Sequence, residues 1–257
     1  MKILLVSSFL PYPLFSGGHI RLFNIIKHLS KNHEIYLVCE KRDYQNEADI
    51  ENVEKFCKKM VTVDRNTQWS LHNIVKTGFS RLPFLLVGHN SEEMKSKINF
   101  LLQKNKFDLI HVETFYVMQN LPETKIPIIL IEHNIEYLVY KRFADGAFLP
   151  IMPILYIDVL KLKYWEERYW KKATKLVAVS QTDKKIMSEK IKDVAVVPNG
   201  ADVKKYQISK IKYQKSNKGK RILFIGDFRW IENRDAAKWI LEEIWPIAKT
   251  AIWKILF

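Results

Sequence analysis

Residues 2–9, KILLVSSF, contain four consecutive apolar side chains, so this segment has no polar face. The same pattern returns in LVAV (176–179) and in ILFI (222–225). Strands that are apolar on both faces are typical of parallel α/β sheets, because helices cover both faces of such a sheet. These segments therefore predict a parallel sheet that includes residues 2–9 as its first strand.

Short apolar segments alternate along the chain with segments of helical periodicity. Within 19–29, for example, Ile20, Phe23, Ile26 and Leu29 form one apolar stripe. This alternation predicts an α/β fold built on a doubly wound parallel sheet. The predicted strands are 2–9, 34–40, 60–64, 107–113, 127–134, 175–180, 193–198 and 221–228, and the predicted helices are 19–29, 92–103, 158–172, 181–190 and 235–245.

Two of these helices carry sequence signals for their first residue. Asn90, with Glu93 three residues later, predicts the N-cap of the helix over 92–103. Ser180, with Asp183 three residues later, predicts a capping box at the start of the helix over 181–190.

The composition excludes several classes of protein. Apolar residues make up 47% of the chain and charged residues 27%, which excludes a disordered chain because such a composition can bury a core. Eight glycines and nine prolines in 257 residues exclude a collagen-like chain. Two cysteines, Cys39 and Cys57, are too few for a disulfide framework or a four-thiolate zinc site.

The sequence also bears on the cellular compartment. The first apolar run is short, Pro11 and Pro13 interrupt the segment after it, and no small-residue cleavage site follows, so it predicts a strand and not a secretory signal. No stretch of about 18 uncharged apolar residues occurs, and no transmembrane helix is expected. We expect a soluble, cytoplasmic protein with a basic surface.

The positive charge is concentrated in one segment. The formal net charge is +14, and residues 203–221 contribute eight basic and no acidic side chains. Like charges without hydrophobic periodicity predict an extended linker. We therefore expect a first domain over 1–200, a basic linker over 201–220 and the truncated start of a second domain over 221–257, since these last residues fall below the domain minimum of roughly 50.

The loop Ser16-Gly17-Gly18, before the predicted helix 19–29, is a candidate anion site. Two glycines let the backbone approach a ligand closely, and the N–H groups and dipole of a helix start favour an anion such as phosphate. Arg21 adds positive charge one turn later. The pattern lacks the third glycine of G-x-G-x-x-G, and a plain turn is the alternative.

Polar residues end two predicted strands: His111 and Glu113 end one, and His133 and Asn134 end the other. Ligands of open parallel sheets bind at the carboxyl ends of the strands, so these residues are candidates for function. For each histidine, a structural role is the alternative. Their spacing does not match a metal motif such as H-E-x-x-H, so no metal is expected.

The ordered set of segments resembles the family 4 glycosyltransferases of GT-B fold. Members that build bacterial surface or exported polysaccharides are especially similar in IEHNIEY (131–137) and WEERYWKKATKLVAVS (165–180). The matching segments are MKILLVSSFLPYP (1–13), SGGHIRLFNIIKHLSKNHEIYLV (16–38), FDLIHVET (107–114), PIILIEHN (127–134), TKLVAVSQTDKKIM (174–187), VVPNGAD (196–202) and RILFIGDFRWIENRDAAKWILEEIWP (221–246).

This resemblance implies a Rossmann-like, acceptor-side GT-B N-terminal domain with an incomplete second α/β domain. It implies a retaining transferase that moves a sugar from a nucleotide-sugar donor to a polysaccharide or lipid-linked acceptor, with no metal or other cofactor. His133 would be the catalytic residue beside the transferred sugar. The implied substrate-binding residues are Gly17 and Gly18 at the donor diphosphate, Arg21, His111, Glu113, Asn134, Asn199 at the passage to the second domain, and Arg229.

The chain departs from the family pattern in its last segment. The nucleotide-binding carboxylates of the family, spaced Glu-x7-Glu, have no counterpart here. In the loop GDFRWIEN (226–233), Arg229 stands near the first donor-phosphate position, whereas Asn233 replaces the expected lysine. From this we expect the isolated chain to be a weak or inactive catalyst.

Other partners and functions are also open at this level. The basic surface and the apolar segment 147–160 suit peripheral contact with an anionic membrane at its inner face, and a buried helix is the alternative for that segment. A GT-B-like sugar-nucleotide epimerase and a non-catalytic basic binding module are alternative functions. Only Tyr206 and Tyr213 interleave with the lysines of the linker, so nucleic acid is not an expected partner.

Overall fold

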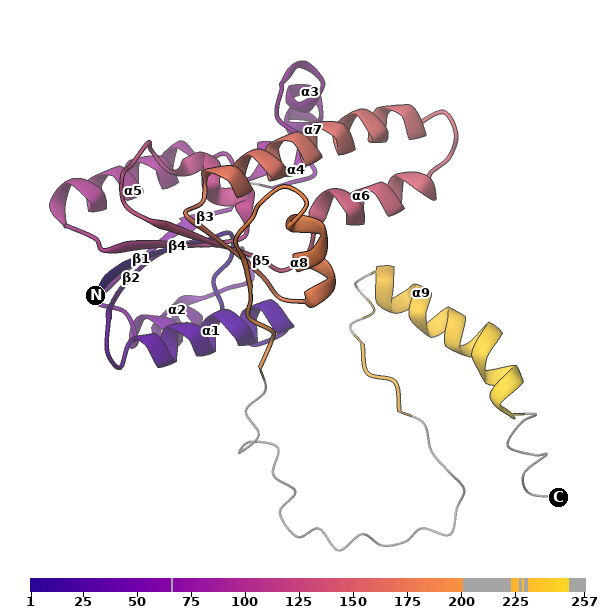
Figure 1. The fold of residues 1–257 in the computed structure, drawn as a ribbon, viewed down its shortest axis with the longest axis horizontal. Helices are drawn as coiled ribbons and strands as arrows, with labels where there is room; N and C mark the ends of the chain where they lie inside the picture. The colour runs from indigo at the N-terminus through magenta and orange to yellow at the C-terminus, as the bar shows by residue number, and fades with distance from the viewer. Residues whose placement is uncertain (66, 201–222, 227, 229–230, 250–257) are drawn as a thin grey trace, which may run out of the picture. The chain divides into compact units, whose positions relative to one another are not determined.

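The computed structural model describes residues 1–65, 67–200, 223–226, 228 and 231–249 (Figure 1). The chain divides into two units, Met1–Ala201 and Asp202–Phe257. The predicted basic linker over 201–220 lies outside the described residues, and the domain boundaries stay predictions.

The first unit contains a seven-stranded sheet in which every neighbouring pair is parallel. The strand order is β3-β2-β1-β4-β5-β6-β7, so the chain winds outward from β1 first in one direction and then in the other. This confirms the doubly wound α/β fold. The strands are β1 (Lys2–Ser7), β2 (Glu34–Lys41), β3 (Lys59–Asp64), β4 (Leu109–Glu113), β5 (Ile128–Glu132), β6 (Lys175–Ala178) and β7 (Val194–Val196).

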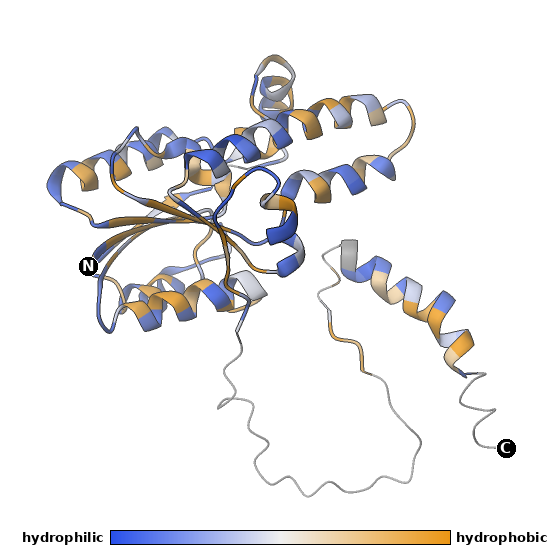
Figure 2. Cartoon of the chain, viewed as in Figure 1, coloured by the Kyte–Doolittle hydropathy of each residue, from blue (hydrophilic) through white to orange (hydrophobic). Residues whose placement is uncertain are grey.

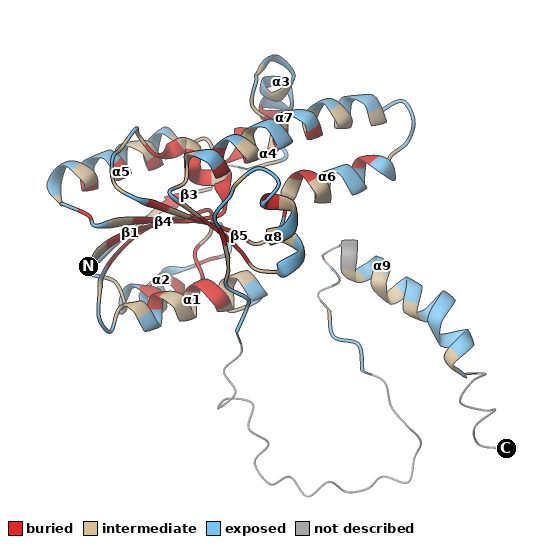
Figure 3. Ribbon diagram, in the orientation of Figure 1, coloured by how far each residue is buried: buried red, intermediate tan, exposed pale blue. Residues whose placement is uncertain are grey.

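The apolar run of β1 packs into two separate cores, one on each face of the sheet. Ile3 and Leu5 join the core under α1 (Gly17–Leu29) and α2 (Glu47–Glu54). Leu4 and Val6 join the larger core on the opposite face. Side chains alternate between faces along a strand, so a strand covered on both sides must be apolar throughout. Figure 2 shows the hydrophobic sheet between its helices, and Figure 3 shows that its strands are buried.

The larger core lies under a layer of several helical segments, and most of them contribute buried apolar side chains to it. These segments are α4 (Phe84–Gly88), α5 (Glu92–Lys104), the 3-10 helix η1 (Phe115–Asn120), α6 (Glu136–Asp145), α7 (Met152–Lys172) and α8 (Gln181–Met187). A further short helix, α3 (Leu71–Phe79), is joined to α7 by hydrogen bonds that Lys161 donates to Thr77 O and Ser80 O.

The structure corrects two predicted helix starts and confirms a third. The N-cap of α5 is Ser91 and not Asn90, because Ser91 Oγ accepts the Met94 N–H at 3.1 Å. Helix α7 begins at Met152, six residues before the prediction, since Pro153 fits the first turn, where no backbone N–H is needed. Ser180 caps α8 as predicted, accepting the Asp183 N–H at 3.0 Å.

In the described part of the second unit, the predicted helix over 235–245 is helical throughout: it covers part of α9 (Ile231–Trp239), the π-helical turn Ile240–Ile244 and the first of the α-helical residues 245–249. The predicted strand over 221–228 is wrong for residues 223–226, which have no strand structure. A strand needs a neighbour to pair with, and the described residues of this unit contain no second strand. Across the described ranges, no helix is long and apolar enough to cross a membrane.

Helix α6 is capped by a side chain of α7. Its own N-cap residue, Ile135, has no capping side chain. The fully buried Glu166 takes this place: its Oε1 accepts the Glu136 N–H and its Oε2 the Tyr137 N–H, both at 2.9 Å. Burial raises the pKa of Glu166 to about 8, although the two backbone N–H groups act in the opposite direction. The start of α6 is therefore held by a long-range contact.

We expect Glu166→Ala to lower the free energy of unfolding by about 2–4 kcal/mol, because it leaves two buried N–H groups without an acceptor. Glu166→Gln keeps one carbonyl oxygen and should lose less. Urea denaturation followed by circular dichroism measures both. The exposed Glu189→Ala is the matched control, and an equal loss there would contradict the capping role.

The raised pKa of Glu166 also predicts a pH dependence. The native state keeps this proton between the ordinary value of 4.5 and about 8, whereas the unfolded chain releases it. The contribution to stability therefore falls as the pH rises through this window, and is absent above it. In Glu166→Gln this part of the decline should disappear. A variant whose stability declines as steeply as that of the wild type would contradict the assignment.

Candidate functional site

The candidate site lies at the carboxyl edge of the sheet, around a carboxylate that ends β4. Glu113 is fully buried, and its two oxygens each accept a hydrogen bond from an imidazole. His111 Nε2 lies 2.8 Å from Glu113 Oε2, and His133 Nε2 lies 2.7 Å from Oε1. Residues 111 and 113 share a face because the side-chain period of a strand is two, and His133 follows the neighbouring strand β5.

The environment of Glu113 keeps it ionised. Burial by itself would raise the pKa of this carboxyl group, but the hydrogen bonds and charges of His111 and His133 lower it to about 2. Arg21 Nε adds a positive charge 3.9 Å from Glu113 Oε1. A buried carboxylate needs such partners, because an unpaired charge in the interior is costly. Glu113 therefore acts as a fixed anchor for both imidazole rings.

The ring of His133 lies against the first residues of α1, Gly17 and Gly18, which together with the N-cap Ser16 we call the glycine turn. A Cβ atom on Gly18 would stand 3.2 Å from His133 Cε1 and 3.3 Å from Nδ1, which is tighter than ordinary contact. Phe9 meets the same ring edge-on, with 6.3 Å between ring centroids. Since Nε2 is bound to Glu113, Nδ1 is the nitrogen that faces the glycine turn. The absence of a side chain at position 18 permits this close approach.

The turn itself is organised by Ser16 and His19. Ser16 caps α1, accepting the His19 N–H, and its hydroxyl also lies 2.7 Å from His19 Nδ1. Burial lowers the pKa of His19, and the charges of Arg42 and His133 lower it further. These effects favour the neutral form of the His19 imidazole beside the glycines. Sequence reasoning missed it, although its place directly after Gly18 was an available signal.

Arg21 points inward from α1 and connects it to the loop after β7. Its Nη1 donates to Pro198 O at 3.0 Å and to Asn199 Oδ1 at 3.3 Å. Asn199 Nδ2 in turn lies 3.9 Å from where a Cβ of Gly17 would be. These contacts are those of a residue that positions the loop. A substrate-binding role for Arg21 stays a prediction.

The structure thus brings most of the predicted site residues into one cluster at the carboxyl edge. Asn134, next to His133, is exposed. Arg229 lies outside the described residues. The roles assigned to all of these residues stay predictions. The clustered residues are Gly17, Gly18, Arg21, His111, Glu113, His133 and Asn199.

The backbone is strained directly after Glu113. Thr114 has φ 68°, in a region that is unfavourable for a β-branched residue. Its N–H donates to Ile131 O at 2.9 Å, and its hydroxyl lies 3.0 Å from Ser8 Oγ. Such strain is characteristic of functional sites, where the surrounding contacts hold it in place. No sequence signal marks this position, because the strain comes from contacts with distant residues.

A second buried cluster lies at the end of β2 and includes Glu40 of that strand. The carboxylate of Glu40 lies 2.8 Å from His89 Nδ1 and 3.8 Å from Arg65 Nε. Burial lowers the pKa of His89, although Glu40 acts in the opposite direction. Both Glu40 and His89 are almost completely buried, so this cluster has the contacts of a structural ion pair. Among the described residues, no group of three or more His, Cys, Asp or Glu side chains could hold a metal ion. That no cofactor is needed stays a prediction.

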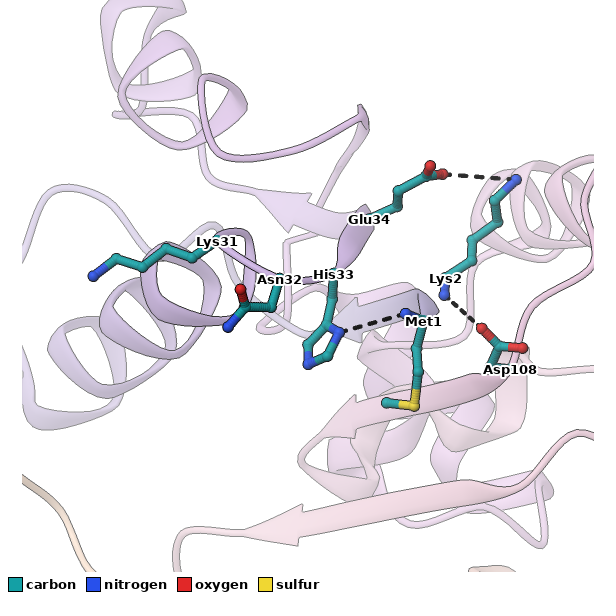
Figure 4. A pocket seen from close by; sticks show the side chains of 7 residues that line it. All are labelled: Met1, Lys2, Lys31, Asn32, His33, Glu34 and Asp108. Atoms are coloured by element: carbon teal, nitrogen blue, oxygen red, sulfur yellow. Dashed lines mark hydrogen bonds and ion pairs between the residues drawn. The ribbon is translucent and has the colours of Figure 1, made fainter.

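A shallow hollow of about 560 Å³ lies at the opposite edge of the sheet, where β1 and β2 begin (Figure 4). Its polar groups are paired with one another: Lys2 N donates to Asp108 Oδ2 at 2.6 Å, and Lys2 Nζ lies 3.8 Å from Glu34 Oε2. Ligands of this fold bind at the carboxyl ends of strands, so this hollow is separate from the candidate site.

Comparison with known proteins identifies the sequence family and the fold. A family model described as Glycosyltransferase Family 4 matches residues 15–205. No curated protein sequence matches the chain. The chain is similar to the crystal structure of Medicago truncatula UGT71G1 complexed with UDP-glucose, with 14% identity, a TM-score of 0.50 and coverage of 79% of this chain and 52% of that chain.

A second similar structure is Phytolacca americana UGT2 complexed with UDP-2fluoro-glucose and pterostilbene. Its identity to this chain is 14%, its TM-score is 0.44, and the match covers 78% of this chain and 52% of that chain. At such low identity the first similarity shows a shared fold alone. The chain spans about half the length of these structures.

The lowered pKa of Glu113 predicts a loss of stability in acid. Its contribution is fully present above the ordinary value of 4.5 and is lost as the pH falls toward about 2, because the unfolded chain takes up this proton first. Glu113→Gln should be less stable at neutral pH and should lack this decline. Urea midpoints measured across the acid range test this, with the exposed Glu93→Gln as control. A control that behaves like Glu113→Gln would contradict the prediction.

Gly18→Ala should displace the His133 ring, because the new methyl group would meet Cε1 and Nδ1. We expect the NMR signals of the His133 ring to shift in this variant. Gly78→Ala is the matched control, since a Cβ at Gly78 has no neighbour within 4 Å. Unchanged His133 signals in Gly18→Ala would contradict the packing described here.

Proposed function

The chain belongs to glycosyltransferase family 4, and from this we propose that it transfers a sugar from a nucleotide-sugar donor to a polysaccharide or lipid-linked acceptor, with retention of configuration. The observation that carries the proposal is the position of His133, which Glu113 holds against the glycine turn at the carboxyl edge of the sheet. Ligands of open parallel sheets bind at this edge.

The donor diphosphate is proposed to lie at the start of α1. The first backbone N–H groups of a helix have no acceptor within the helix, and the helix dipole favours negative charge there. Gly17 and Gly18 occupy these first positions and carry no side chain that would keep a phosphate away. Ser16 already accepts the His19 N–H, so the glycine N–H groups are the ones proposed to bind phosphate.

His133 is proposed to bind a hydroxyl group of the transferred sugar. In the neutral form of His133, an Nε2–H group that donates to Glu113 leaves Nδ1 without a proton, so this nitrogen can accept a hydrogen bond. Glu113 fixes both the proton position and the ring orientation in the same way that a buried carboxylate orients other functional histidines. His111 occupies the second oxygen of Glu113 and is proposed to keep that carboxylate in place.

In the proposed reaction, the bond between the sugar C1 and the diphosphate oxygen breaks, and a bond from C1 to the acceptor oxygen forms on the same face. The acceptor proton passes to the departing phosphate oxygen, so charge and atoms balance. The chain contributes orientation and electrostatic stabilisation of the leaving diphosphate at the start of α1. No further protein group is needed for the bond changes themselves.

The proposal also covers where the protein acts and how active this chain is by itself. The acceptor is proposed to be reached from the cytoplasmic side, with the chain in peripheral contact with an anionic inner membrane face. We expect turnover by the 257-residue chain alone to be weak or absent, because Asn233 stands where the resemblance to the family implies a lysine for the donor phosphate.

His133→Ala should reduce sugar transfer by about a hundredfold or more while the protein stays folded, since a positioned group in the transition state is lost. Transfer is measured with nucleotide sugars and a glycan or lipid-linked acceptor, on the longest encoded form of the protein and on this chain. His28→Ala, an exposed histidine of α1, is the control. Full transfer by His133→Ala would remove this residue from the site. Donor turnover that never requires an acceptor would favour an epimerase instead.

A further inference from the structure

Helix α3 presents its apolar stripe to solvent. Leu71, Ile74, Val75 and Phe79 recur at the spacing that places side chains on one face of a helix. All four are at least half exposed, and Phe79 is 93% exposed. Such a stripe normally packs into a core, yet here it is uncovered in the described structure (Figures 2 and 3).

The first half of α7 has a second exposed apolar stripe. Ile154, Ile157, Leu160 and Tyr164 lie on its outer side, and each is more than half exposed. The side of α7 toward the sheet is apolar as well and carries the buried Leu162. Phe148, Leu149 and Ile151, in the turn before α7, are also exposed. The predicted alternative of a buried helix over 147–160 is therefore wrong.

Hydrogen bonds join the end of α3 to α7, and on this ground we treat the two stripes as one surface. Lys161 of α7 donates to Thr77 O at 2.9 Å and to Ser80 O at 2.8 Å, at the end of α3. Trp165 Nε1 donates to Arg81 O at 2.9 Å. We call the exposed side chains of α3, of the turn 148–151 and of the outer side of α7 the α3–α7 face.

The α3–α7 face is positively charged. A hollow of about 720 Å³ lies between α7 and the residues that follow α3, and no acidic side chain is among its lining residues, which are Ser80, Arg81, Leu160, Lys161, Tyr164, Trp165 and Arg168. No acidic residue occurs between Asp64 and Glu92, so α3 and its flanking loops carry only positive charge. Apolar side chains beside the guanidinium groups of Arg81 and Arg168 fit an amphipathic, anionic partner.

The α3–α7 face also lies toward the edge of the sheet that bears the candidate site. The segment containing α3 leaves the sheet at the carboxyl end of β3, and the α6–α7 hairpin leaves it at the carboxyl end of β5. Figure 1 shows this hairpin projecting past the carboxyl ends of the strands. A partner bound at the α3–α7 face would therefore lie toward the same edge of the sheet as the candidate site.

We propose that the α3–α7 face docks on an anionic lipid bilayer. Its apolar side chains enter the boundary between headgroups and acyl chains, and Arg81 and Arg168 contact lipid phosphates. This inference deepens the proposed function. Its purpose, which is to bring the site to a lipid-linked acceptor, rests on that function. The docking itself requires no sugar, so it is tested separately.

The charge of the surface argues against two other occupants. In a symmetric dimer through this face, Arg81 and Arg168 of one copy would meet the same cations of the other, which is repulsive. The basic segment 203–221 would be repelled in the same way. A bilayer with anionic headgroups supplies both the apolar layer and the negative charge that the face lacks.

The test is flotation of the 257-residue chain with vesicles of phosphatidylcholine alone and with phosphatidylglycerol added. We expect binding only to the anionic vesicles and a steep loss of binding as salt rises. Arg81→Glu with Arg168→Glu should weaken binding by about tenfold or more, since each basic residue near such a surface contributes about fivefold. Lys97→Glu with Lys192→Glu makes the same charge change at exposed sites elsewhere and should retain most of the binding.

Ile157→Ser tests the apolar part and should also weaken binding several-fold, whereas Phe100→Ser, an equally exposed apolar position on α5, should not. Circular dichroism confirms that each variant is folded. The proposal would be overturned if the chain bound neutral vesicles equally well, or if the two charge variants lost binding equally. It would also be overturned if the chain formed a dimer that Ile157→Ser dissociates. Loss of sugar transfer with normal vesicle binding would contradict the proposed function and leave the docking surface supported.

Discussion

The candidate site depends on one buried negative charge. Glu113 has no exposure to solvent, so its ionised form requires partners, and these come from three elements: His111 on β4, His133 after β5 and Arg21 on α1. Arg21 extends the network to Asn199 after β7. The groups that compensate the charge of Glu113 thus connect β4, β5 and α1 at the carboxyl edge of the sheet. The same contacts hold the ring of His133 in one orientation.

The two faces of the sheet stabilise buried acids in opposite ways. On the α1 face, imidazole donors lower the pKa of Glu113. On the α7 face, burial raises the pKa of Glu132 and of Glu166, and the charge of Glu166 raises that of Glu132 further. The strained Thr114 separates these environments, since Glu113 precedes it and Phe115, whose N–H donates to Glu132 Oε2, follows it. Two residues that are only two positions apart, Glu113 and Phe115, therefore belong to the two different environments.

The elements that leave the carboxyl edge divide into two kinds. The first turn of α1 packs closely against His133, with Gly18 where a Cβ atom would lie only 3.2 Å from the ring. The segments around α3 and α7 instead leave apolar and basic side chains in solvent. A polar site beside an exposed apolar and basic surface is the arrangement that the proposed transfer to a membrane-held acceptor requires.

The sequence by itself determined the doubly wound sheet, because strands covered on both faces must be apolar throughout, and that pattern is local. It also located the polar strand ends and the Gly17–Gly18 turn, since residues at the ends of parallel strands share one edge. Tertiary structure alone decided that Arg21 faces inward, that Thr114 is strained and that Glu166 caps α6. It also decided that the apolar stripe of α3 stays exposed and that residues 223–226 form no strand. The periodicity of a segment shows which of its side chains can be buried. Which other segment covers it, pairs with it or strains its backbone depends on residues far away in the chain.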